Sequence, residues 1–211
     1  MVDFDQEKWN EEFDKWFQLR YKVPPKHTRI HNSKWKVSLF DHEEFASQGI
    51  KKGKGNGMIQ ALEKLTIECD NNSRTSIKRK QHADNLNNVL LLVGLAESAK
   101  RDTAETSTSV THIGVGIGST AENEDQTGLI TAQDARKPFD TDGDRVVTNQ
   151  TAKYHMYFDD TDITYPITLR EACTFTAITA GIAHCRIQHP DFLFGVNDVL
   201  VYQINETHRN G

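Results

Sequence analysis

The stretch ITYPITLREACTFTAITAGIAHCRI, residues 163–187, decides the fold because its apolar side chains recur at every second position. Such a period of two is typical of β-strands with one buried face. A turn of small residues, Thr179–Gly181, separates two runs of this kind and predicts a β-hairpin. The alternating positions are Ile163, Tyr165, Ile167, Leu169, Cys173, Phe175 and Ala177, followed by Ala183, Cys185 and Ile187.

Three further stretches extend this pattern. VTHIGVGIG (residues 110–118) alternates apolar residues with Gly114, Gly116 and Gly118, so one face of the strand is bare and a second backbone can approach it. Residues 154–158 also alternate, and VLVYQI (residues 199–204) is apolar on both sides, as a central or subunit-covered strand would be. At least five strands without helical breaks predict a mainly β protein with an antiparallel β-sandwich.

Glu171 interrupts the apolar face of the predicted hairpin. It has the same parity as Leu169 and Cys173, so its side chain should point inward. A buried carboxylate without a partner costs several kcal/mol. We therefore predict a buried polar contact between Glu171 and Arg136, Arg145 or backbone N–H groups.

The first half of the chain has a helical period instead. Aromatic residues recur on one stripe over residues 5–18, and shorter helices are predicted to begin at Asp41, near Met58 and near Asp84. Residues 15–40 contain no acidic residue, and Pro24-Pro25 prevents a continuous helix there, so this stretch is predicted to be an extended basic arm.

These patterns divide the chain into three parts. Residues 1–97 form a helical and extended basic N-terminal assembly region, residues 98–109 a polar linker, and residues 110–211 the β-sandwich domain. Residues 1–101 hold 18 Lys and Arg against 14 Asp and Glu, whereas residues 102–211 hold 7 against 16. Opposite charges suggest two surfaces with different neighbours. The predicted partner-binding residues are Trp9, Phe13, Trp16, Lys26, Arg29, Lys34 and Lys36.

Several functional classes are disfavoured by the sequence. No run of 18 apolar residues is present, and the acidic N-terminus is unlike a secretory signal. The glycines of residues 114–118 complete no nucleotide-binding motif. The DTDGD turn (residues 140–144) lacks the glycine position and the final glutamate of a calcium loop, and His27/His31 and His184/His189 are weak ligand pairs. We expect three buried thiols, no cofactor, no metal and no catalytic residue.

Residues 84–205 resemble a domain found in structural proteins of tailed viruses, in particular tail-fibre, tail-collar and baseplate components. The matching elements are Thr111–Thr120, Leu129 with Arg136, Tyr154–Phe158, the Ile167/Arg170/Glu171/Ala172/Phe175 run, Gly181–Ile187 and Asp198–Ile204. The sequence departs from the family where Cys173-Thr174-Phe175 replaces Gly-Leu-Phe, and in its long acidic loop between Ser119 and Arg145. The resemblance implies a passive scaffold that attaches fibres or plates through oligomeric interfaces.

The sequence therefore predicts a non-enzymatic virion structural protein, made in the host cytoplasm, with a homo-oligomeric state and other virion proteins as partners. One alternative is a nucleic-acid-binding neck or packaging protein that uses the basic N-terminal half. Contact with an acidic protein surface is favoured over nucleic acid, because aromatic residues are sparse among the basic ones. Another alternative is a carbohydrate-binding β-sandwich, which would need exposed aromatics beside residues 140–144.

Overall fold

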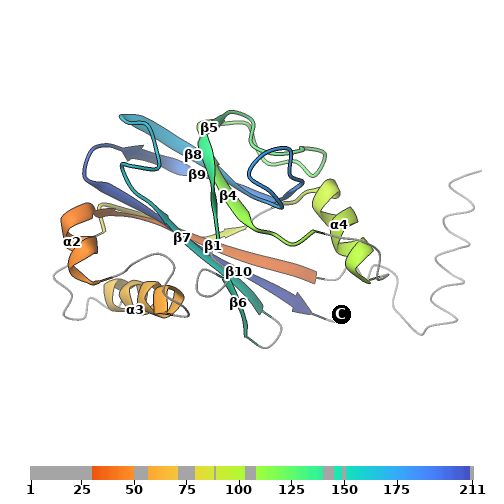
Figure 1. Cartoon of the computed structure of the whole chain (residues 1–211), viewed down its shortest axis with the longest axis horizontal. Coiled ribbons are helices and arrows are strands. Elements are labelled where there is room, and N and C mark those ends of the chain that lie inside the picture. Colours follow the sequence, from red (N-terminus) through yellow and green to blue (C-terminus); the bar gives the residue numbers. More distant parts are fainter. Residues whose placement is uncertain are drawn as a thin grey trace, which may run out of the picture. The chain divides into compact units, whose positions relative to one another are not determined.

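The computed structural model describes residues 30–49, 57–70, 79–87, 89–102, 108–139, 145–148 and 151–209, and strands dominate among them (Figure 1). The strands are β1 (Ile30–Asp41), β2 (Gln81–Asn87), β3 (Val89–Leu90), β4 (His112–Gly116), β5 (Ala132–Pro138), β6 (Arg145–Thr148), β7 (Thr151–Phe158), β8 (Ile167–Phe175), β9 (Ala183–Phe194) and β10 (Asp198–Arg209). The helices are α2 (His42–Ser47), α3 (Gly57–Asp70) and α4 (Leu92–Asp102). None of these helices has the length and apolar character needed to cross a membrane.

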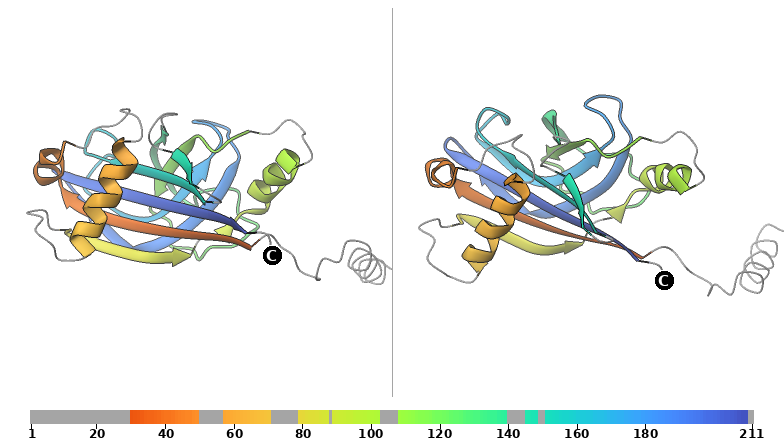
Figure 2. Two further views of the ribbon diagram at one scale, coloured as in Figure 1. Left: turned by 90° about the horizontal axis from the view of Figure 1, so that it is seen from below. Right: turned by 60° about the horizontal axis from the view of Figure 1, so that its bottom comes forward.

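The strands form two five-stranded sheets (Figure 2). The first sheet has the order β2-β1-β10-β7-β6, and the second has the order β3-β9-β8-β4-β5. The pairs β1–β2, β6–β7, β7–β10, β3–β9, β8–β9, β4–β8 and β4–β5 are antiparallel. The prediction of a mainly β, antiparallel protein is confirmed.

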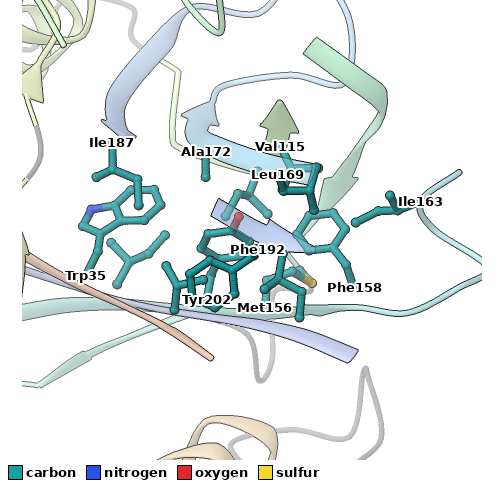
Figure 3. Close-up of a cluster of buried hydrophobic side chains, with 14 of the residues drawn as sticks. Trp35, Val115, Met156, Phe158, Ile163, Leu169, Ala172, Ile187, Phe192 and Tyr202 are labelled. Atoms are coloured by element: carbon teal, nitrogen blue, oxygen red, sulfur yellow. The ribbon is translucent and has the colours of Figure 1, made fainter. Parts of the chain in front are cut away.

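Both sheets contribute side chains to one hydrophobic core (Figure 3). Trp35, Met156 and Tyr202 belong to strands of the first sheet, and Leu169 and Ile187 belong to strands of the second. The Trp35 and Tyr202 rings meet edge to face, with centroids 6.2 Å apart. Burial of large apolar side chains from both sheets is the main favourable term that stabilises this arrangement.

β10 is the central strand of the first sheet and is apolar on both faces, in agreement with the sequence pattern. Leu200 and Tyr202 enter the core shared by the two sheets. Val199 and Val201 pack on the other face in a second cluster with Phe45 of α2 and with Leu62 and Leu65 of α3. Figure 2 shows α3 lying across this face of the first sheet.

The predicted helix start at Asp41 is confirmed. Asp41 Oδ1 accepts hydrogen bonds from the backbone N–H groups of Glu43 and Glu44, at 3.0 and 3.4 Å. These bonds satisfy donors that the first turn of α2 leaves without helical partners. Gly49 follows α2 with a φ of +68°, the left-handed conformation that glycine adopts readily after a helix.

The predicted N-terminal region and linker differ from the structure. Most of β1 lies within the predicted basic arm, and β2 and β3 occupy the region after Asp84 where a helix was expected to begin. Residues 98–102 belong to α4 rather than to a linker, and one compact unit extends from Asn32 to Thr207. The boundary is misplaced because β1 pairs with β2 and neighbours β10, so the N-terminal half supplies two strands of the first sheet.

The parity predicted for β8 also changes midway along the strand. The register of β8 against β9 shifts between Leu169 and Glu171, as in a β-bulge. Leu169 and Ala172 therefore share the core between the sheets, whereas Cys173 and Phe175 belong to a separate cluster with Leu91 of the α4 region. Glu171 is buried as expected, but on the face of the second sheet opposite to the shared core.

Candidate functional site

The bare face of β4 is covered by the same chain. A Cβ atom added to Gly116 would lie 2.5 Å from the Thr131 carbonyl oxygen and 2.6 Å from Glu171 Oε1. At Gly114 it would lie 3.2 Å from both the Leu129 and the Phe175 side chains. A second backbone does approach Gly116 closely, at Thr131 of the same chain, whereas side chains of the same chain cover Gly114.

Glu171 holds this covering segment in place. Its Oε1 accepts hydrogen bonds from the backbone N–H groups of Gly118 (3.0 Å) and Thr131 (2.9 Å), and its Oε2 accepts one from Ile130 (3.1 Å). The carboxylate is fully buried. Backbone donors thus meet Glu171, which is one of the two kinds of partner that the sequence suggested.

Arg186 on β9 supplies the balancing charge. Its Nε donates to Glu171 Oε2 at 2.8 Å, and the guanidinium is fully buried. Nη1 donates to Gln126 Oε1 at 2.8 Å and Nη2 to the Thr120 carbonyl at 2.9 Å. One arginine therefore joins the buried carboxylate to both the beginning and the middle of the loop over residues 117–131. A buried ion pair that is hydrogen-bonded to the loop at several points in this way favours a single loop position.

Arg136, one of the two arginines predicted to meet Glu171, has other contacts instead. Arg136 Nη1 donates to the Ala177 carbonyl at 2.9 Å, and its guanidinium lies 3.4 Å from the centroid of the Phe175 ring. Arg145 begins β6, and its side chain lies outside the described residues. Sequence reasoning missed Arg186, although a charged residue between Cys185 and Ile187 in an otherwise apolar strand was a usable signal.

A pocket of about 440 Å³ adjoins the covered glycines. We call it the hairpin pocket, because the β8–β9 connection forms one wall; its lining residues are Gly114, Thr127, Gly128, Leu129, Ala132, Gln133, Asp134, Arg136, Phe175, Ile178 and Thr179. The stacked Arg136 and Phe175 give it a cationic group beside an aromatic wall. The Asp134 carboxylate accepts hydrogen bonds from the backbone N–H (2.7 Å) and hydroxyl (2.9 Å) of Thr164. Arg136 is thus the group best placed to receive an anionic ligand.

Basic side chains near the predicted arm form ion pairs within the chain. Lys36 Nζ lies 3.3 Å from one oxygen of Asp70, and Arg79 Nη1 lies 2.7 Å from the other. Lys80 Nζ lies 2.6 Å from Asp198 Oδ1. Neighbouring carboxylates offset these positive charges, which weakens the case for nucleic-acid binding at this surface.

The other predicted partner-binding residues are only partly described. Lys34 is exposed on β1, opposite Asn87 of β2. Outside the described residues lie the DTDGD turn at residues 140–144, His27, and the side chains of Trp9, Phe13, Trp16, Lys26, Arg29 and His31, although the His31 backbone belongs to β1. Their assignments remain predictions.

His189 does not join His184 in a ligand pair but lies in the core. Its Nε2 is 2.9 Å from the Tyr202 hydroxyl, and its Nδ1 is 2.8 Å from the Pro190 carbonyl. Burial lowers the pKa of His189 to about 4, from an ordinary value of 6.5. The folded protein therefore keeps the imidazole neutral at a pH where the unfolded chain protonates it.

We predict a loss of stability below pH 6.5 that depends on His189. Because the unfolded state binds the proton more tightly, the contribution is complete above pH 6.5 and is lost as the pH falls toward 4. Between pH 7 and pH 4.5, wild type should lose about 2–3 kcal/mol more unfolding free energy than His189→Gln. Urea unfolding of both proteins at the two pH values measures this difference. Equal losses in the two proteins would contradict the assignment.

Comparison of the chain with protein-family models, with curated proteins and with solved structures gave no match, so the functional interpretation depends on the residues themselves.

Proposed function

We propose that this protein is a non-enzymatic structural subunit of a tailed-virus particle, in its tail, collar or baseplate. In this proposal the two sheets stack as a β-sandwich that mediates subunit assembly and attachment. The hydrophobic core shared by both sheets supports a stacked arrangement. The resemblance of residues 84–205 to virion structural domains supports the location in a particle.

The hairpin pocket is the observation that carries the assembly role. Ile178, which lines the pocket, is 51% exposed, and the stacked Arg136 and Phe175 line it as well. Aromatic and arginine side chains in a pocket are the residues that most often dominate the binding energy of protein interfaces. When a partner covers a large apolar side chain beside the pocket and removes it from water, the complex is stabilised.

The occupant that we propose is another copy of this chain, which presents an apolar side chain next to a carboxylate. A guanidinium has five N–H donors, and among the described residues Arg136 uses one, to the Ala177 carbonyl. Residues 102–211 carry 16 Asp and Glu against 7 Lys and Arg, so a second copy offers many carboxylates. The aromatic residues of the N-terminus, Trp9, Phe13 and Trp16, are proposed as additional subunit contacts.

Ile178→Asp should shift the protein toward the monomer. The new carboxylate beside the pocket would have to be desolvated in the interface, and a tenfold or larger weakening of self-association corresponds to about 1.4 kcal/mol. Sedimentation equilibrium over a wide concentration range measures the association constant. Stability should change little, since the side chain is half exposed.

Val147→Asp is the matched control for this experiment. Val147 on β6 is 71% exposed and is not part of the hairpin pocket, so the same change of chemistry there should leave self-association unaltered. Equal weakening by both variants would remove the pocket from the interface. A wild-type protein that is monomeric at all concentrations would overturn the proposed self-assembly.

A further inference from the structure

A second group of buried polar side chains lies away from the hairpin pocket. His184 and Cys185 lie near the start of β9 in the second sheet, and Glu206 lies on β10 of the first. The exposed fractions of the three residues are 3%, 0% and 1%. The group therefore connects the two sheets at a position where water has almost no access.

The three ligand atoms are close together. Cys185 Sγ lies 3.1 Å from His184 Nδ1 and 3.1 Å from Glu206 Oε1, and the histidine nitrogen lies 3.8 Å from the same carboxylate oxygen. All three atoms thus lie within 4.8 Å of one another. Burial of an imidazole, a thiol and a carboxylate in one place is costly unless hydrogen bonds or a cation compensate it.

We propose that His184, Cys185 and Glu206 bind one zinc ion that fastens β9 to β10. Imidazole nitrogen, thiolate sulfur and carboxylate oxygen are the ligand types of zinc, at bond lengths of about 2.0–2.3 Å. Tetrahedral geometry with these bonds separates the ligand atoms by roughly 3.4–3.6 Å. The observed separations of 3.1–3.8 Å differ from this by a few tenths of an ångström.

The surroundings of His184 fit this role. Its second ring nitrogen, Nε2, lies 3.4 Å from Ser98 Oγ on α4. A histidine that ligates a metal through one nitrogen usually donates a hydrogen bond from the other, which fixes the tautomer and the ring orientation. Donation from Nε2 to Ser98 leaves the lone pair of Nδ1 directed toward Cys185 and Glu206.

A catalytic role for the same three residues is disfavoured by burial. A cysteine nucleophile needs a thiolate that a substrate can reach, whereas Cys185 is fully buried within the core shared by both sheets. Zinc binding replaces the thiol proton: the sulfur–hydrogen bond breaks, a sulfur–zinc bond forms, and one proton is released to solvent. No oxidant or reductant is needed, and the site goes beyond the proposed assembly role without depending on it.

Metal titration of the full-length, reduced and chelator-treated protein tests the site. We expect one zinc ion per chain, release of about one proton per zinc at a pH where the thiol is protonated, and a higher melting temperature in the presence of zinc. Cobalt in place of zinc should produce a thiolate-to-cobalt absorption band. Cys185→Ser should abolish this band and weaken metal affinity beyond the roughly 100-fold that is typical for loss of an outer-shell partner.

Cys173→Ser is the matched control, because Cys173 is equally buried on the neighbouring strand β8 but is not part of the group. It should keep both the stoichiometry and the absorption band. If Cys185→Ser does not fold, Glu206→Gln, which preserves side-chain shape, should weaken the affinity instead. Folded wild-type protein that retains no metal, or a cobalt band that survives in Cys185→Ser, would overturn the proposal.

Discussion

Glu171→Gln is expected to lower the free energy of unfolding by about 3–5 kcal/mol, the range for breaking a buried ion pair by removing one partner. The substitution leaves the Arg186 guanidinium, which is fully buried, without its counter-ion. The amide also presents an N–H₂ group in place of an oxygen that accepts backbone hydrogen bonds, so the loop over residues 117–131 loses part of its anchor. Chemical denaturation followed by circular dichroism measures the change.

Asp191→Asn is the matched control for this prediction. Asp191 pairs with Arg170 on the same two strands, with Nε 2.9 Å from Oδ1, but the Asp191 side chain is 65% exposed. Loss of an exposed pair should cost less than about 1 kcal/mol, because water screens both charges. Similar effects of the two substitutions, or a stable Glu171→Gln protein, would refute the view that the buried carboxylate anchors the loop.

Trp35→Ala is expected to cost about 3–5 kcal/mol, the usual effect of removing a large aromatic side chain from a core. Trp35 is fully buried and contacts Tyr202 of β10 in the core shared by the two sheets. The measured change in stability distinguishes two interpretations of Trp35, as part of a partner-binding arm or as part of a core strand. An arm that reaches toward a partner would lose only binding when the tryptophan is removed, whereas a core strand loses stability.

Lys34→Ala provides the comparison at the adjacent position. The Lys34 side chain is exposed on the same strand, so its removal should change the unfolding free energy by no more than about 0.5 kcal/mol. Urea denaturation of both variants and of wild type gives the two differences. An equally small effect of Trp35→Ala would place the tryptophan outside the cooperative core.

The period of two in the sequence was enough to predict most of the strands in the second half of the chain. The strands predicted at residues 110–118, 154–158, 163–177, 183–187 and 199–204 overlap β4, β7, β8, β9 and β10, although β8 is shorter than predicted. Asp41 predicted the start of α2, because a carboxylate before a helix satisfies local backbone donors. These features depend on interactions between near neighbours or on burial of one strand face, and both leave a direct trace in the residue order.

The sequence did not predict several other features, most of which depend on contacts between residues far apart in the chain. β1 does carry a period of two, since Trp35, Val37 and Leu39 alternate with polar residues, but its lysines favoured the prediction of a basic arm; in the structure β2 and β10 flank it. The bulge in β8 reverses the parity after Leu169, and only the pairing with β9 reveals it. A one-residue slip of this kind moves every later side chain to the opposite face. The sequence indicated that Glu171 would be buried, but it did not show on which face.

The residue order by itself determined that this is a mainly β protein with a strand apolar on both sides and a buried carboxylate in need of donors. Only the tertiary structure decided that the N-terminal half completes the first sheet, that Arg186 neutralises Glu171, and that His184, Cys185 and Glu206 meet. The physical reason is that period and capping are local properties of the chain. Strand pairing and ion pairing instead join residues that are far apart in the sequence. Which residues meet depends on the register in which their strands pair.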